Sequence, residues 1–438
     1  MLEKIKQNPW YFFSPFLVLY VVFVGLLHKD ALEGDEGRYI MFAQNLLNGF
    51  YSPKEELNLW NGPGYPILLM PFLALELPLI LITLLNAFLQ YVSIVLLYKT
   101  IKIYASNVTA LFFSLIWACY YPSYRGMAEI LTETLSLFLI TLVIFSICKA
   151  FHSSKKIYVI TAGVSIGYLV LTKIIFGYAL LILLVFLLFL NSLKSVFKTA
   201  SLSKVPKLLS IHTIAFVCIL PYISYTYAMT SRFFYFGNSG GMSLYWMSTP
   251  FENEYGDWKN QNLRDECTAC ALCNIEQLEK NHRQNLDYIL QFKGLARDDA
   301  YKKIAIQNIK SHPAKFLRNC FANQSRLWFG LPNSYHTEQD TTILKFLPNV
   351  FLLTFFLIAL PLWCYNFKSV PSEVSLLLFL LLLYLILSTI VSVYMRQFCV
   401  VVPIILLWLS VIFSRTLTIK TKFEVENDGL LSNQKLPI

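Results

Sequence analysis

Charged side chains are scarce in this sequence, and their scarcity excludes an ordinary soluble globular protein. Asp, Glu, Lys and Arg make up 14% of the 438 residues, whereas a soluble domain carries about 25%. Hydrophobic residues make up 56% of the chain, and the mean hydropathy is +0.55. Apolar runs of about 17–25 residues, long enough to cross a bilayer as helices, recur along the sequence. We therefore predict an all-α, polytopic membrane protein.

Acidic residues are nearly absent from the loops in which lysine gathers. An excess of Lys and Arg marks the cytoplasmic loops of a membrane protein, so we place these loops in the cytoplasm. The net charge of +10 has this origin, and no basic-aromatic module accompanies it, so no nucleic-acid partner is expected. The basic positions are Lys4, Lys6, Lys99, Lys102, Lys149, Lys155, Lys156, Lys194, Lys198, Lys204, Lys207, Lys368, Arg415, Lys420 and Lys422.

Internal repeats of 20–50 residues are not visible in the sequence. With the lysine loops inside, about ten spans alternate so that both termini are cytoplasmic. The first run has no small-x-small cleavage site, so we expect it to be a retained span. The predicted spans are 10–28, 78–98, 107–122, 130–148, 157–172, 174–193, 208–228, 343–365, 374–394 and 398–414.

The same topology divides the chain into four parts. We predict an N-terminal transmembrane catalytic module over 1–228, an external domain over 229–342, C-terminal spans over 343–414 and a cytoplasmic tail over 415–438. The first module contains an external loop, 29–77.

Short helices are predicted in both external segments. Apolar residues at helical spacing between Glu36 and Phe50, followed by Asn48-Gly49 as a stop, indicate an amphipathic helix at the membrane surface. Pro66 and Pro71 interrupt Tyr65–Leu77 and Pro78 follows it, and this segment is too short for a span. The external domain begins with a glycine-rich turn, 237–241, and ends with helical patterns over 300–311 and 314–329.

Charged residues in or beside the spans share the predicted outer face. An ionised side chain at a helix centre costs about 2.5–3.5 kcal/mol, so such residues normally face a partner or a wet cavity. Each could also be a loop residue reaching for water. Convergence of several segments on one face favours an outward-facing polar site. Its candidates are Asp35, Glu36, Arg38, Arg125, Glu129, Glu133, Lys173 and Arg396.

Both signs of charge occur in this candidate site. Asp35 could accept a proton, and Asp35 with Glu36 could bind a hard divalent cation through oxygen. An anionic leaving group such as phosphate suits the cations Arg38, Arg125, Lys173 and Arg396. A base beside a phosphate-binding group at a membrane face suggests group transfer from a lipid-linked phosphate donor.

The run Asp35-Glu36-x-Arg38-Tyr39, followed by Ala43, Leu46, Leu47 and Gly49, resembles the first external loop of the GT-C glycosyltransferases. The resemblance is closest to the protein O-mannosyltransferase and aminoarabinose-transferase-like branch. Later segments of this sequence also resemble motifs of that branch. They are Pro63-Gly64-Tyr65-Pro66, 129–139, 169–173, Gly240-Gly241 with Leu244, and 395–403. Two places differ: Asn61-Gly62 stands where the aminoarabinose branch has Glu-Lys, and Gln397 replaces the Tyr after the late Arg.

The resemblance implies a GT-C-type bundle and an inverting transfer from a polyprenyl- or dolichyl-phosphate sugar. Asp35 would be the base, Glu36 would support it or a metal, and Arg38 and Arg396 would bind the lipid phosphate. Arg125, Glu133 and Lys173 would assist, with Tyr39, Tyr65 and Glu129 nearby. The acceptor would be a lipid, glycan or protein, and membrane lipids would surround the spans. The expected location is the plasma membrane (the inner membrane in a bacterium), with an extracytoplasmic active site. No G-x-G-x-x-G run follows a strand pattern, as expected for a lipid-linked donor.

Cysteine clusters in the external domain. Cys267, Cys270 and Cys273 form C-x-x-C-x-x-C, and Cys320 follows. Thiolate ligands for zinc or a cluster are one interpretation. Disulfides are favoured in an oxidising compartment, although the pairing cannot be deduced. Asn323-Gln324-Ser325 also fits the N-glycosylation triplet, a pattern that occurs by chance.

Other functions remain open from the sequence. A lipid or sugar transporter or flippase also places charge in membranes, but usually at the midplane and with inverted repeats. A non-catalytic membrane assembly protein could use the same fold and should tolerate neutral substitution in its acidic cluster. Among enzymes, an oligosaccharide polymerase or ligase is an alternative to single-sugar transfer.

Overall fold

The computed structural model describes residues 8–29, 31–193, 204–260, 275–334, 342–365 and 370–416, and within these ranges it contains helices and no strand. The elements of the first half are α2 Pro9–Leu27, α3 Asp35–Leu47, α4 Gly64–Ala74, α5 Ile80–Ile101, α6 Asn107–Ala118, η1 Tyr121–Ser123, α7 Arg125–Ala128, α8 Thr132–His152, α9 Lys156–Thr172 and α10 Ile175–Leu193. Those of the second half are α11 Val205–Thr230, α12 Gly240–Met247, α13 Ile275–Ile289, α14 Gly294–Ser311, α15 Pro313–Phe329, α16 Thr342–Tyr365, α17 Ser372–Thr389, α18 Met395–Phe398, η4 Cys399–Val401 and α19 Val402–Thr416.

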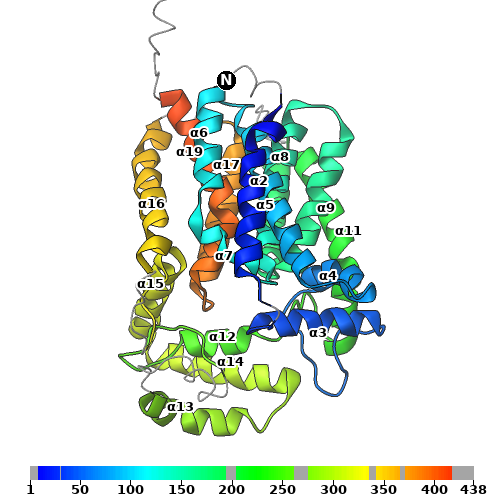
Figure 1. Cartoon of the computed structure of the whole chain (residues 1–438). Coiled ribbons are helices and arrows are strands. Elements are labelled where there is room, and N and C mark those ends of the chain that lie inside the picture. Colours follow the sequence, from blue (N-terminus) through cyan, green and yellow to red (C-terminus); the bar gives the residue numbers. More distant parts are fainter. Residues whose placement is uncertain are drawn as a thin grey trace, which may run out of the picture.

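Eight of the described helical segments are long and apolar enough to cross a membrane: α2, α5, α8, α10, α11, α16, α17 and the segment from α18 to α19. The prediction of an all-α polytopic membrane protein is confirmed. The predicted span 107–122 is shorter than expected, because α6 has 12 residues. The predicted span 157–172 is matched by α9, which has 17 residues. Tyr121-Pro122 begins a 3-10 turn soon after α6 ends. In Figure 1, α6 and α9 stand within the bundle beside the longer helices.

One end of the bundle brings together lysines from the loops predicted to be cytoplasmic. Glu373, at the start of α17, accepts a hydrogen bond from Tyr104 after α5 (2.9 Å) and pairs with Lys204 before α11 (3.4 Å). Lys207 donates to a carbonyl near the end of α8. The lysine-rich helix ends therefore meet at one end of the bundle. Helices α3, α12, α13 and α14 lie across the opposite end, away from the N-terminus (Figure 1).

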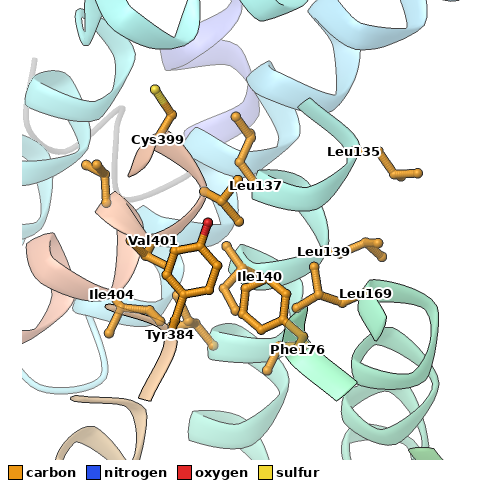
Figure 2. Close-up of a cluster of buried hydrophobic side chains, with 14 of the residues drawn as sticks. Leu135, Leu137, Leu139, Ile140, Leu169, Phe176, Tyr384, Cys399, Val401 and Ile404 are labelled. Carbon is orange, nitrogen blue, oxygen red and sulfur yellow. The ribbon is translucent and has the colours of Figure 1, made fainter. Parts of the chain in front are cut away.

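The core lies between the membrane helices. Figure 2 shows Leu137 and Ile140 of α8 facing Phe176 of α10 and Tyr384 of α17. The rings of Phe176 and Tyr384 stack with centroids 5.0 Å apart. Several hydroxyl groups inside the helices donate to carbonyls one turn back, as Ser136 does to Thr132 at 2.6 Å and Thr141 does to Leu137 at 2.7 Å. This local bonding lets polar residues sit in an apolar helix without a buried unpaired donor.

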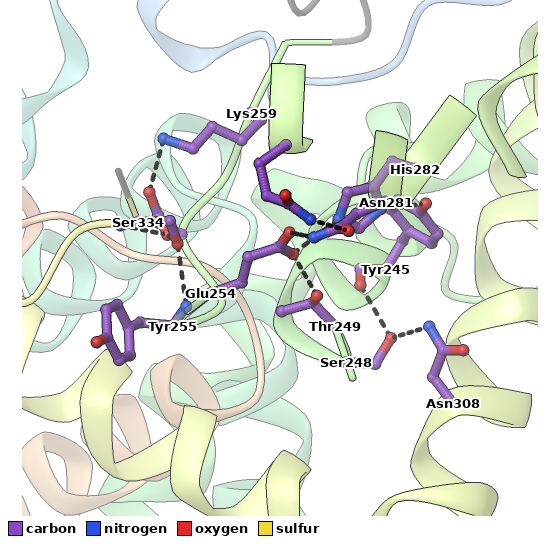
Figure 3. A network of polar contacts seen from close by, with 12 residues as sticks. Tyr245, Ser248, Thr249, Glu254, Tyr255, Lys259, Asn281, His282, Asn308 and Ser334 are labelled. Carbon is purple, nitrogen blue, oxygen red and sulfur yellow. Dashed lines mark hydrogen bonds and ion pairs between the residues drawn. The ribbon is translucent and has the colours of Figure 1, made fainter. Parts of the chain in front are cut away.

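The helices that lie across the end of the bundle away from the N-terminus have a second hydrophobic cluster, built from α12, α13 and α14 around Trp246, Leu286 and Ile304. A buried polar network lies beside it (Figure 3). His282 bonds Glu254 at 2.7 Å through one ring nitrogen and Tyr245 at 2.6 Å through the other. These contacts join α12 and α13 to the loop between them, so the outer helices form a packed layer over the end of the bundle.

Candidate active site

Helix α3 presents Asp35 and Arg38 together because they are three residues apart at its first turn. Glu36 closes that turn, since one of its carboxylate oxygens accepts the Glu33 N–H at 2.8 Å. The helix ends at Leu47 and is capped by Asn48. The amphipathic helix predicted between Glu36 and Phe50 is thus present, one residue earlier at its start.

Five charged side chains from four parts of the chain form a continuous series of contacts, which we call the ion-pair chain. Arg38 Nη2 donates to Asp35 Oδ1 at 2.5 Å, and Arg396 Nη2 donates to Asp35 Oδ2 at 2.6 Å. Arg396 Nε lies 3.7 Å from Glu133 Oε1, to which Lys173 Nζ also donates at 3.1 Å. Asp35 and Arg396 are 361 residues apart in sequence, yet they are in direct contact.

The ion-pair chain is open at one end and buried at the other. The side chain of Arg396 is 40% exposed and that of Asp35 is 30% exposed, whereas Glu133 is 7% exposed. Three cations face two carboxylates, so the group keeps an excess of positive charge that suits an anion. Burial acts to raise the pKa of Asp35, but the adjacent Arg38 and Arg396 guanidiniums lower it more, so its pKa lies below the usual value. Asp35 is therefore ionised near neutral pH.

Helix α15 positions Arg396 through the loop that precedes it. The Asn323 amide donates to the carbonyls of Ser388 at 2.9 Å and Val391 at 2.6 Å. Arg326, fully buried, donates through Nε to the Val393 carbonyl at 3.1 Å. Asn323 belongs to the Asn-x-Ser triplet, but its side chain is completely buried and its amide is used inside the protein. Sequence reasoning missed this role because the triplet pointed to a surface modification.

Glu36 links α3 to the start of α8. Its second carboxylate oxygen accepts the Ile130 N–H at 2.7 Å, and Asn86 donates to the Glu129 carbonyl at 3.1 Å. These bonds hold the segment just before Glu133, and so they set the distance between Glu133 and the residues of α3. Glu36 therefore faces backbone donors on both of its oxygens.

The turn before α4 supports Arg38 and approaches the end of α9. Arg38 Nε donates to Asn61 Oδ1 at 2.7 Å, and the guanidinium lies 5.1 Å from the ring centroid of Trp60. The Asn61 amide donates to the Tyr39 hydroxyl at 3.1 Å. A Cβ atom at Gly62 would lie 2.0 Å from the Leu171 carbonyl oxygen, which excludes any larger residue there. Asn61 is therefore needed to bond Arg38 and Tyr39, and Gly62 is needed for the close approach to α9.

The other predicted residues lie at different distances from the ion-pair chain. Tyr65 is fully buried, with its ring edge-on to Tyr39 at 5.3 Å. Glu129 precedes α8, in the segment that Glu36 holds. Arg125 begins α7, and its side chain lies outside the described atoms.

The cysteine prediction falls largely outside the described residues, which include neither Cys267, Cys270 nor Cys273. Cys320 lies on α15 with a free, buried thiol, and burial raises its pKa.

A divalent metal does not fit the predicted Asp35–Glu36 pair as it stands. Asp35 accepts from two guanidiniums, and Glu36 accepts from two backbone N–H groups, so their oxygens do not converge. Two adjacent guanidiniums would also repel a cation. Among the described residues, no group of three or more His, Cys, Asp or Glu side chains is arranged to hold a metal ion.

Comparisons with known proteins identify the fold. No protein-family model and no curated protein sequence matches the chain. The oligosaccharyltransferase of Archaeoglobus fulgidus, solved with a tethered acceptor peptide, matches with a TM-score of 0.51 and 13% identity over 97% of this chain and 54% of the archaeal chain. The same enzyme, AglB, in complex with an inhibitory peptide and a dolichol-phosphate, matches with a TM-score of 0.50, 13% identity and coverage of 98% and 54%. ArnT of Cupriavidus metallidurans, bound to undecaprenyl phosphate, has a TM-score of 0.40 and 11% identity over 92% of this chain and 77% of ArnT.

The chain therefore has the GT-C fold that its motifs predicted. It spans about half the length of the archaeal oligosaccharyltransferase. Eight apolar helices within that fold make it an integral membrane protein.

Proposed function

We propose that this protein is a membrane glycosyltransferase that moves a sugar from a polyprenyl-phosphate donor to an acceptor hydroxyl on the extracytoplasmic face. The observation that carries the proposal is the ion-pair chain, which combines a carboxylate with phosphate-binding cations at the bundle end opposite the lysine-rich loops. The excess of lysine at the other end favours an external site. The fold supports the proposal, since the archaeal oligosaccharyltransferase has been solved with a dolichol-phosphate.

Arg396 is the best candidate to bind the donor phosphate. It is the most exposed of the three cations, and its guanidinium presents paired N–H groups that match two phosphate oxygens. Lys173 lies on the far side of Glu133 and adds positive charge deeper in the site. A phosphate at Arg396 would replace the Asp35 carboxylate as the acceptor of its N–H groups.

That replacement gives Asp35 its role as a base. In the ligand-free arrangement both Asp35 oxygens accept from guanidiniums, which lowers the pKa and makes the carboxylate a weak base. When the phosphate takes Arg396, Oδ2 is released and the pKa of Asp35 rises. The released oxygen can then accept a proton from the acceptor hydroxyl.

The transfer step follows from these positions. The acceptor oxygen forms a bond to the anomeric carbon while the bond from that carbon to the phosphate oxygen breaks. The electron pair leaves with the phosphate, and the acceptor proton goes to Asp35. Arg396 and Lys173 stabilise the charge that develops on the departing phosphate. Attack from the side opposite the leaving group inverts the anomeric centre.

Reconstituted protein tests this function. The full chain in lipid nanodiscs would be given undecaprenyl-phosphate hexoses and pentoses together with a membrane extract as the acceptor source. Release of undecaprenyl phosphate and formation of a new glycosidic bond would be followed by mass spectrometry. Asp35→Asn is expected to abolish transfer at normal abundance, whereas Asp299→Asn, which changes an exposed ion pair with Arg232, serves as the matched control.

If Asp35→Asn retained transfer, Asp35 would not be the base. Sugar that crosses a liposome membrane without a new glycosidic bond would instead indicate a transporter. Donors carrying one sugar or an oligosaccharide, compared in the same assay, separate single-sugar transfer from the en bloc reaction of an oligosaccharide ligase.

A further inference from the structure

A cleft of about 450 Å³ lies beside Arg38, the residue at one end of the ion-pair chain. Its walls are α3, the loop 53–60, the turn before α12, and the start of α14. Arg38 lines the cleft and also donates a hydrogen bond to Asp35. The guanidinium of Arg38 therefore lies between the cleft and the proposed base. The volume lies within the range of about 300–1,000 Å³ that is typical of small-molecule sites.

The glycine-rich turn 237–241 builds this cleft by joining two of its walls. The Asn238 amide donates to the Leu57 carbonyl, and its Oδ1 accepts the Leu59 N–H, both at 2.8 Å. The Gly241 N–H donates to Asp298 Oδ1 at 2.7 Å. A Cβ atom at Gly241 would lie 2.1 Å from the Asp298 carbonyl oxygen, so the turn needs glycine to approach α14 this closely. The cleft is therefore a fixed feature of the fold.

The lining combines aromatic rings with balanced charge. Trp60 and Tyr301 supply the rings, and amide side chains supply further donors and acceptors. Tyr301 is 2% exposed, and its hydroxyl has no hydrogen-bond partner among the described residues. The cations Arg38 and Arg297 are matched by the carboxylates Glu56 and Asp298. Such a lining does not favour a strongly anionic or strongly cationic ligand.

We propose that this cleft binds an uncharged saccharide, with a sugar ring against Trp60, and that this saccharide is the acceptor. Rings of Trp and Tyr offer an apolar face to the C–H groups of a sugar, while amides and carboxylates bond its hydroxyls. Arg38 lines the cleft but Arg396 and Lys173 do not, and the helices that form its walls lie across the end of the bundle. A soluble or surface-borne sugar can therefore enter while the lipid phosphate occupies the other side. The acceptor role rests on the proposed function.

Ligand binding can be measured without turnover. The full chain in nanodiscs would be titrated with methyl glycosides and disaccharides of neutral hexoses and N-acetylhexosamines, followed by saturation-transfer NMR. An acidic and a basic peptide of similar mass are the competing probes. Saccharide affinity is expected to fall about tenfold in Trp60→Ala and about threefold in Tyr301→Phe. Trp60→Phe should keep most of the affinity, and Phe233→Ala, a change at an 80% exposed aromatic outside the cleft, should keep all of it.

Undecaprenyl phosphate, titrated separately, keeps this inference distinct from the proposed function. If the wild type binds that lipid but no saccharide, or prefers a peptide, the cleft assignment is overturned while the proposed function stands. If Arg396→Gln leaves lipid binding unchanged, the proposed function fails as well. Should Trp60→Ala weaken binding of undecaprenyl-phosphate hexose relative to the bare lipid phosphate, the cleft holds the sugar of the donor and the acceptor assignment falls. Thermal unfolding of each variant identifies any loss that comes from misfolding.

Discussion

Neutralising Asp35 should strengthen the binding of the lipid phosphate even as it abolishes transfer. In the ligand-free arrangement Asp35 occupies the same Arg396 N–H groups that the phosphate would use. Asp35→Asn removes the negative charge while keeping the shape of the side chain, so the phosphate meets a weaker competitor. A base that served only the chemical step would not affect the binding of a lipid that carries no sugar.

The expected size follows from the contacts that are exchanged. Arg396 and Asp35 form a charge-assisted hydrogen bond of 2.6 Å, and both side chains are partly exposed, at 40% and 30%. Such a bond contributes about 1.5–3 kcal/mol when shielded, and solvent reduces this to about 1–2 kcal/mol here. The dissociation constant for undecaprenyl phosphate should therefore fall about five- to thirtyfold.

Native mass spectrometry or thermophoresis of the nanodisc-embedded protein would measure this constant for the wild type, Asp35→Asn and Asp299→Asn. The last variant breaks a 2.6 Å ion pair with Arg232 on the outer surface, away from the ion-pair chain, and should leave the constant unchanged. Unchanged or weaker lipid binding by Asp35→Asn would refute the exchange of Arg396 between carboxylate and phosphate.

Three further outcomes follow from the packing. Gly62→Ala should lower the free energy of unfolding by about 1–3 kcal/mol, because its Cβ would collide with a backbone carbonyl of α9. Gly240→Ala is the control, because a Cβ there would meet open space. Equal melting temperatures for the two variants would contradict this prediction. Asn323→Ala should lower the free energy of unfolding by about 2–3 kcal/mol and reduce transfer, because three backbone carbonyls before α18 lose their donor. Ser325→Ala should leave both nearly unchanged. If Ser325→Ala had the same effect as Asn323→Ala, loss of glycosylation would be the cause. Burial raises the pKa of Glu254, but its hydrogen bonds lower it more, so its folded-state pKa lies below the usual value. Its contribution to stability is complete above about pH 4.3 and is lost as pH falls through the folded-state pKa, so Glu254→Gln should flatten the fall in melting temperature on acidification; an unchanged slope would exclude this carboxylate.

The membrane helices could be predicted because apolar run length is a direct consequence of bilayer thickness. The contact between Asp35 and Arg396 was also within reach, since an alternating topology places the residue after the first span and the residue before the last span on one face. The lysine loops set that alternation. Helix α6 is shorter than its predicted span, because apolar composition does not show where a helix ends in a turn.

Partnerships that depend on tertiary packing could not be predicted from the sequence. Nothing in the local sequence shows that Glu36 accepts the Ile130 N–H, 94 residues away, or that Asn61 bonds Arg38. Asn323 was interpreted from its triplet, which contains no information about burial. The cleft is formed by four segments. The sequence predicted the helix of α3, part of α14 and the glycine-rich turn, but not that these segments enclose a cleft.

The two carboxylates of the ion-pair chain differ in a way that suits an exchange of partners. Glu133 is buried and contacts both Arg396 Nε and Lys173 Nζ, so it keeps these two cations at a fixed spacing. Asp35 is more exposed and lies at the mouth of the site on a short surface helix. A phosphate can therefore displace the exposed carboxylate while the buried one still orients Arg396. The exchange needs only a local shift of side chains, because Asn323 and Glu36 hold the backbone on either side of it.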